Sequence, residues 1–108
     1  MRQGTTPAYT VTVCDRDLRD KTVYVTLRDQ RGGTVTKTGS DLSIFREGAD
    51  SVILFRLSQQ ETFGLSLGKI RMQVRYVDAF GVAEATDIAE IKNLEVLLRE
   101  IIPIEGGE

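Results

Sequence analysis

Apolar and polar residues alternate without interruption over residues 69–76, and this is the clearest structural signal in the chain. The apolar set falls on one side and the polar set on the other: Ile70, Met72, Val74 and Tyr76 against Lys69, Arg71, Gln73 and Arg75. A period of two places successive side chains on opposite faces of a β-sheet. The pattern therefore predicts a strand with one packed face and one face in water.

Shorter strands are predicted upstream, separated by turn-forming residues, over residues 9–13, 21–28, 34–38, 42–46 and 51–57. The last of these is apolar on both faces, which is typical of a strand covered on both sides. Gly32 and Gly33 supply the positive φ that a tight hairpin turn needs. Several short strands at intervals of about ten residues favour a sandwich or a small barrel.

A single helical turn is predicted after residue 58. The sequence Ser-Gln-Gln-Glu at 58–61 has the spacing of a capping box, in which the serine oxygen accepts from the third amide and the glutamate reaches back. We expect this turn to direct Phe63 and Leu65 inward and to end at Gly64 and Gly68.

The C-terminal third supports two interpretations. Apolar residues recur there at intervals of three or four, as on an amphipathic helix: Ala85, Ile88, Ile91, Leu94, Leu98 and Ile101. Residues 78–81, Asp-Ala-Phe-Gly, instead form a plausible hairpin connection that leads back from the strand before them. Periodicity alone favours the helix, and the residues by themselves leave both interpretations open.

Composition describes one ordinary globular domain over residues 1–108, with an ordered body at about 7–102. A chain of 108 residues with 41% hydrophobic and 28% charged residues can bury a core without disulfides. The net charge of −2 argues against a nucleic-acid partner. No apolar run approaches the roughly 20 residues that span a bilayer. The lone cysteine, Cys14, is expected to be a strand residue near a loop, and it indicates folding in a reducing cytosol.

Candidate chemistry is sparse. Histidine is absent, which removes the commonest general base and metal ligand. Asp15, Asp17 and Asp20 could offer oxygens to calcium, but they lack the glycine and distal glutamate of an EF-hand loop, so a solvated turn is the better interpretation. No two carboxylates are marked as an acid/base pair. We therefore predict no catalytic residues, no cofactor site and no metal site, and we do not expect an enzyme.

One polar stripe could receive an acidic partner. It consists of Arg71, Gln73 and Arg75 on a single strand face, with Arg56 expected nearby. A solvated face with cross-strand ion pairs is the alternative interpretation. Several acidic residues could answer these arginines within the chain or between copies: Glu84, Asp87, Glu90, Glu95, Glu100 and Glu105.

Four motifs in order along the chain carry a resemblance: Gly-Thr-Thr-Pro at 4–7, Leu-Ser-Gln-Gln-Glu-Thr at 57–62, Gly-Lys-Ile-Arg-Met-Gln-Val-Arg at 68–75 and Gly-Val-Ala-Glu-Ala-Thr at 81–86. With them the chain resembles small β-sandwich proteins of phages and prophages of Gram-positive bacteria, described as tail, baseplate or virion components. Ser58, Gln60 and Thr86 depart mildly from that pattern, where threonine, glutamate and serine are usual. The resemblance covers the charged loop at 14–20 and the acidic tail poorly.

The resemblance implies a return strand over residues 82–92, which overrules the helix, and leaves a helical turn open for residues 94–99. Together with the strand pattern it implies an all-β, immunoglobulin-like antiparallel sandwich of about seven short strands with one short helical turn. It further implies a non-catalytic structural protein of a phage or prophage tail or baseplate, made in the host cytoplasm and incorporated into the virion. Its expected partners are other tail proteins or copies of itself, with no nucleic acid and no membrane. The alternative is a carbohydrate- or cell-surface-binding module, although few aromatic residues remain to build a stacking platform.

Overall fold

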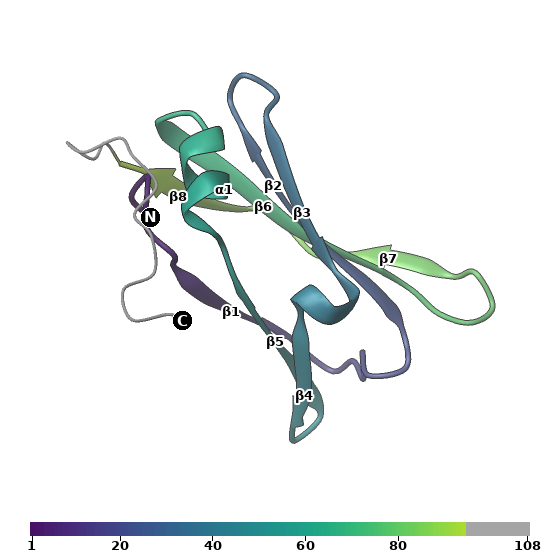
Figure 1. The fold of residues 1–108 in the computed structure, drawn as a ribbon. Helices are drawn as coiled ribbons and strands as arrows, with labels where there is room; N and C mark the ends of the chain where they lie inside the picture. Colours follow the sequence, from purple (N-terminus) through teal and green to yellow (C-terminus); the bar gives the residue numbers. More distant parts are fainter. Residues whose placement is uncertain (95–108) are drawn as a thin grey trace.

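Two antiparallel β-sheets pack face to face in the computed structural model, which describes residues 1–94 (Figure 1). The smaller sheet has the strand order β1-β5-β4, formed by Ala8–Val13, Asp50–Arg56 and Ser43–Glu47. The larger sheet has the order β3-β2-β6, formed by Thr34–Thr38, Thr22–Asp29 and Gly68–Val77. On its far side β6 pairs with both β7 and β8, which are Ala83–Ala85 and Ala89–Asn93. Two short helical pieces complete these elements, a 3₁₀ turn η1 at Gly39–Asp41 and a helix α1 at Gln59–Gly64.

The prediction of an all-β sandwich with one short helical turn near residues 59–64 is confirmed, while the immunoglobulin-like arrangement stays a prediction. Each upstream strand lies within one residue of its expected bounds. The capping box is also confirmed, because the Ser58 side chain accepts from the Glu61 amide and Glu61 accepts from the Ser58 amide. The folded body begins before residue 7, since the side chain of Gln3 is already buried.

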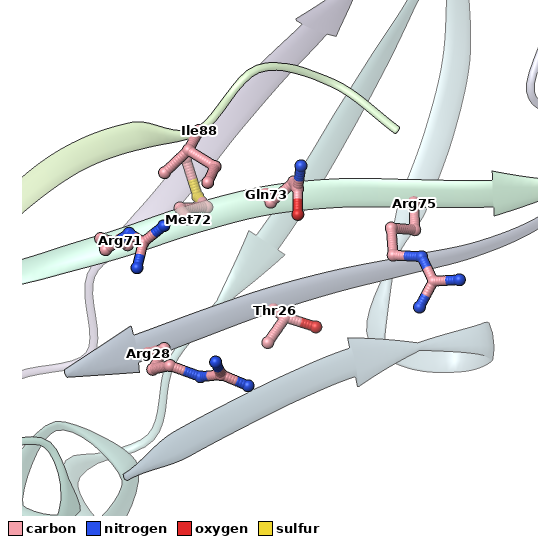
Figure 2. Close-up of a pocket in the computed structure, with 7 residues that line it drawn as sticks. All are labelled: Thr26, Arg28, Arg71, Met72, Gln73, Arg75 and Ile88. Atoms are coloured by element: carbon pink, nitrogen blue, oxygen red, sulfur yellow. The ribbon is translucent and has the colours of Figure 1, made fainter. Parts of the chain in front are cut away.

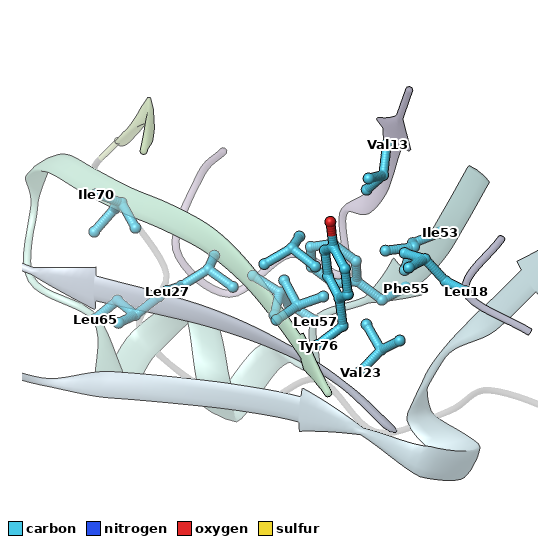
Figure 3. Packing of buried hydrophobic residues seen from close by; sticks show 12 residues of the cluster. Val13, Leu18, Val23, Leu27, Ile53, Phe55, Leu57, Leu65, Ile70 and Tyr76 are labelled. Carbon is cyan, nitrogen blue, oxygen red and sulfur yellow. The ribbon is translucent and has the colours of Figure 1, made fainter. Parts of the chain in front are cut away.

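The core lies between the two sheets, where alternating side chains of both inner faces meet (Figure 3). The buried apolar residues come from β2, β6, β5, the end of β1 and the segments beside them: Val13, Leu18, Val23, Val25, Leu27, Ile53, Phe55, Leu57, Leu65, Ile70, Val74 and Tyr76. Full burial of each such side chain stabilises the fold by about 1.5–3 kcal/mol before entropy is counted. The core therefore fixes which face of every strand points inward.

Strand β5 is covered less completely than its sequence predicts. Ile53 and Phe55 face the core as expected, and Val52 is 6% exposed. Leu54, however, is 38% exposed, so the prediction of cover on both sides is wrong at that position. Val52 lies on the outer face directly opposite Phe45, whose ring can shield it, whereas Leu54 lies opposite the small Ser43. The apolar residues on the outer face of β5 are thus shielded by a side chain of the neighbouring strand where one is large enough, and not by a second covering layer.

The described part of the C-terminal third, which ends at residue 94, forms strands, so the helix that periodicity favours is wrong for residues 83–93. β7 and β8 both pair antiparallel with β6, as the return strand over 82–92 implied, but a break at residues 86–88 separates them. The connection at 78–81 is a tight turn, in which the Asp78 amide donates to Val82 and the Asp78 carboxylate accepts from Phe80. The helical turn considered for residues 94–99 falls almost entirely outside the described residues.

A buried set of polar side chains joins α1 to the N-terminus and to β8. The Asn93 amide nitrogen donates to the carbonyl oxygens of Thr62, Leu65 and Ser66 at 3.1, 2.9 and 3.3 Å. The Gln3 amide donates to the same Leu65 oxygen at 3.2 Å. Carbonyl groups at a helix C-terminus lack partners within the helix. Asn93 therefore supplies hydrogen bonds that α1 cannot make for itself.

The carboxylate of Asp29 performs a similar task at the β2–β3 turn. It accepts from the backbone amides of Arg31 and Gly33 at 2.8 and 2.7 Å and from the amide of Ser66 at 2.9 Å. These bonds, led by the one from Ser66, lower the pKa of Asp29. Gly32 has a φ of 89°, and a Cβ on Gly33 would lie 2.6 Å from the Asp29 carboxylate, so both glycines are needed. We call Gln3, Asp29, Thr62 and Asn93 the polar clamp.

Candidate functional site

The polar side of β6 forms the centre of an exposed basic surface on the outer face of the larger sheet. Arg71 and Arg75 are exposed, and Gln73 between them is half-buried. Their inward-facing neighbours Val74 and Tyr76 are buried in the core. The alternation predicted from the sequence is therefore confirmed, and the core packing holds these three polar side chains on the outside.

Arg28, on the neighbouring strand β2, completes this surface. Antiparallel pairing sets Arg28 directly opposite Arg71 and Thr26 directly opposite Gln73. The prediction that Arg56 lies nearby is wrong. Arg56 belongs to β5 in the other sheet, where it donates to the Thr6 carbonyl at 2.6 Å. Sequence reasoning missed Arg28 because the pairing of β2 with β6 was not known. Its position at the end of an alternating polar series on β2 was the available signal.

A shallow hollow of about 250 Å³ lies between these side chains. Figure 2 shows Arg28 and Thr26 on one strand, Arg71, Gln73 and Arg75 on its neighbour, and Ile88 beside Met72 on the far side. The side chain of Ile88 is 46% exposed. We call this surface the arginine face, and its members are Thr26, Arg28, Arg71, Gln73, Arg75 and Ile88.

A one-residue bulge between β7 and β8 brings Ile88 to this face. Arg75 pairs with Ala85 and Met72 pairs with Ala89, so three residues on one strand oppose two on the other. The bulge is held by Thr86, whose amide donates to the Val74 carbonyl at 2.9 Å. β-Bulges bend a strand and redirect side chains. This bulge places an apolar residue beside a row of guanidinium groups.

Carboxylates do not neutralise the arginine face from within the described part of the chain. Glu90 lies opposite Arg71 in the register, yet the two side chains form no ion pair among residues 1–94. Glu84 is turned elsewhere, accepting from Arg16 at 3.2 Å and from the Tyr76 hydroxyl at 3.2 Å. This contact raises the pKa of Arg16, mainly through the hydrogen bond with Glu84.

Of the remaining acidic residues that were expected to pair with the arginines, only Asp87 lies in the described part of the chain. Asp87 lies in the bulge, and its carboxylate forms no ion pair within the described range. Glu95, Glu100 and Glu105 lie outside the described residues. The stripe of Arg71, Gln73 and Arg75 therefore forms an open basic surface over residues 1–94. The alternative interpretation, a face with cross-strand ion pairs, is not observed there.

The aspartate-rich loop is tied to arginines and backbone groups. Asp17 pairs with Arg19 at 3.0 Å and with Arg46 at 3.5 Å, and the hydrogen bonds from Arg19 lower the pKa of Asp17 strongly. Asp15 has a φ of 56°, and its amide donates to Asp50. Within the described range no group of three or more His, Cys, Asp or Glu side chains is arranged to hold a metal ion. Cys14 is exposed in the turn that follows β1, one residue beyond the strand in which it was predicted.

Comparison with known proteins adds no family assignment. No family model matches the chain, and the curated proteins contain no match to it. No helix over residues 1–94 has both the length and the apolar character needed to cross a bilayer. Guanidinium groups donate several hydrogen bonds in a planar fork, which suits carboxylates and phosphates.

Proposed function

We propose that this protein is a non-catalytic docking module that binds other proteins through the arginine face. The observation that carries the proposal is the grouping of Arg28, Arg71 and Arg75 on one sheet face without an ion pair inside the described chain. A guanidinium group stays charged at neutral pH and exchanges no proton. It suits binding and positioning, and the proposal assigns it no reaction.

The sequence resemblance supports a setting for this docking. The motif at residues 68–75 that resembles phage tail and baseplate proteins runs along β6, the strand that carries Arg71 and Arg75. We therefore propose a structural component of a phage or prophage tail or baseplate, made in the bacterial cytoplasm and incorporated into the virion. Its partners would be neighbouring tail proteins, with copies of itself as a further possibility because virion parts are built from repeated contacts.

A purified-particle experiment tests this proposal. Particles produced by the phage or lysogen that encodes the chain should contain it in a fixed ratio to the tail proteins, measured by quantitative mass spectrometry. Arg28→Gln with Arg71→Gln should reduce its incorporation. Arg31→Gln with Arg56→Gln removes the same charge from other exposed surfaces and should leave incorporation unchanged. Absence of the wild-type chain from purified particles would refute the proposal, and light scattering on the free protein would show whether copies associate.

One observation favours the carbohydrate-binding alternative. Tyr24 is 43% exposed and lines a second hollow of about 200 Å³ together with Arg75 and Val77. An exposed tyrosine ring beside hydrogen-bond donors suits stacking against a sugar ring. A glycan array distinguishes the two functions, because binding to cell-wall glycans that is lost in Tyr24→Ala would favour the alternative. An array without hits would remove it.

A further inference from the structure

We propose that the arginine face binds an extended acidic segment of a partner protein, with carboxylates at positions i and i+4 and an apolar side chain at i+2. The inference rests on the proposed docking function and names the class of partner. The match in spacing comes from β6 itself. Arg71, Gln73 and Arg75 project from alternate residues, which are about 6.6 Å apart in a strand. An extended peptide lying along β6 presents its own alternate side chains at the same interval.

Charge complementarity supports an acidic occupant. The outer-facing positions of the larger sheet carry five cations and one carboxylate in the described strands: Arg28, Lys69, Arg71, Arg75, Lys92 and Glu90. The whole chain has a net charge of −2, so the positive charge is concentrated on this face. Arg28 and Arg71 lie directly opposite each other, and like charges in that position repel. A carboxylate placed between them would relieve this repulsion and accept from both guanidinium groups.

Apolar surface between the cations favours a peptide over a phosphate polymer. Ile88 precedes Ala89, which pairs with Met72, so it lies beside Gln73 and between the levels of Arg71 and Arg75. Its exposed side chain offers a contact to an apolar residue at i+2, and inorganic polyphosphate has no group for that contact. A long polyanion would also extend past this face onto the negatively charged remainder of the chain. A short peptide segment remains within the basic surface.

Titration of the isotopically labelled protein by NMR tests the inference with defined probes. The first peptide is Gly-Ser-Glu-Ser-Leu-Ser-Glu-Ser-Gly, which has the proposed spacing. Two matched peptides replace both glutamates by glutamine or the leucine by serine. An oligothymidylate of similar length and inorganic polyphosphate serve as the phosphate probes. We expect the first peptide to shift amide signals of residues 26–28, 71–75 and 86–88, with weaker binding of both matched peptides.

Variants of the protein locate the contact. Arg28→Gln with Arg71→Gln should raise the Kd of the first peptide about tenfold or more, because charge-assisted hydrogen bonds are lost. Arg31→Gln with Arg56→Gln should change the Kd less than about twofold, since these charges lie away from the site. Ile88→Ser should weaken the leucine peptide and leave the serine peptide unchanged.

Three results would overturn the inference: equal binding of the glutamine peptide, tighter binding of either phosphate probe, or equal losses in the two double variants. Presence of the chain in purified particles combined with any of these would remove the inference and leave the proposed function intact. Tight binding of the acidic peptide by a chain that is absent from particles would remove the proposed tail setting instead.

Discussion

The polar clamp and the arginine face are both rich in polar side chains, but they differ in whether these side chains have hydrogen-bonding or charged partners within the described chain. In the clamp, the Asn93 amide donates to three carbonyl oxygens and the Asp29 carboxylate accepts from three backbone amides. On the arginine face, Arg28, Arg71 and Arg75 form no ion pair with the described residues. Buried polar groups need partners inside the chain because water cannot reach them.

The difference suggests a division of roles between the two regions. Bonds in the clamp hold α1, the β2–β3 turn and β8 together, so their loss should lower the free energy of unfolding. Exposed guanidinium groups are hydrated and contribute little to stability, so their loss should be felt in binding. Substitutions in the two regions, and one at the N-cap of α1, can therefore test this contrast. They are ordered by the expected change in the free energy of unfolding, from the largest to the smallest.

Asn93→Ala should lower the free energy of unfolding by about 3 kcal/mol, because the buried carbonyls of Thr62 and Ser66 lose their donor. The Leu65 carbonyl keeps its bond from Gln3. The Asn93 Oδ1 atom has no partner among the described residues, so its removal offsets a small part of the loss. Urea denaturation measures the effect, with Gln60→Ala on the exposed side of α1 as the control. A loss below about 1 kcal/mol would show that the clamp does not hold α1.

Asp29→Asn should cost about 1.5–2 kcal/mol at pH 7, because an amide that keeps two acceptor bonds turns a donor toward the Ser66 amide. The pKa of Asp29 is lower in the folded state than its ordinary value. Its stabilising contribution is therefore present above about pH 4 and is lost as the pH falls through the folded pKa.

Urea midpoints measured from pH 7 down to pH 3 check the effect of Asp29. The wild-type curve should converge toward the Asp29→Asn curve in acid. Asp87→Asn, an exposed change, should run parallel to the wild type. Curves for Asp29→Asn and the wild type that stay equally far apart at every pH would contradict the assigned role of the carboxylate charge.

Ser58→Ala should cost about 1 kcal/mol, which is the usual loss on removing an N-cap. The Ser58 oxygen accepts from the Glu61 amide at 3.1 Å, and Glu61 also pairs with Lys37 at 2.7 Å, so the ion pair should keep part of the local structure. Thermal denaturation followed by circular dichroism measures the change. Ser58→Asp should restore most of the lost stability, and failure to do so would show that capping is not the cause.

Arg28→Gln with Arg71→Gln should change the free energy of unfolding by less than about 0.5 kcal/mol, because exposed like charges opposite each other do not stabilise a sheet. A slight gain in stability is expected at low salt, where the repulsion is screened least. Denaturation at two salt concentrations checks this. A loss above about 1 kcal/mol would mean that these arginines support the fold, and the contrast with the polar clamp would fail.

Local patterns predicted most of the fold, since alternation, Gly32-Gly33 and the capping box each act within a few residues. The helix over the C-terminal third failed for a physical reason. Ala85, Ile88 and Ile91 recur every three residues because a bulge interrupts a strand, and this spacing imitates a helical face. The hairpin connection at 78–81 was the better guide.

The candidate site was only partly predictable. Arg71, Gln73 and Arg75 share a strand, so their common face followed from a period of two. Arg28 lies beside Arg71, and Arg56 lies away from it in the other sheet, because of which strands become neighbours. The packing of the whole core decides that pairing. The polar clamp joins residues 3, 62 and 93, which no local pattern connects.

The bulge at residues 86–88 also absorbs one extra residue of the chain, which keeps the apolar side of β8 turned inward. If all three residues paired continuously with β6 and formed no bulge, Glu90 would lie opposite Ile70 and Ile91 would turn toward solvent. Deletion of one of the three residues would instead remove the bulge and leave the inner and outer residues of β8 in place. A point substitution at the same place would alter only one side chain. Among homologous sequences, a segment that is one residue shorter should consequently be compatible with the same pairing of β8.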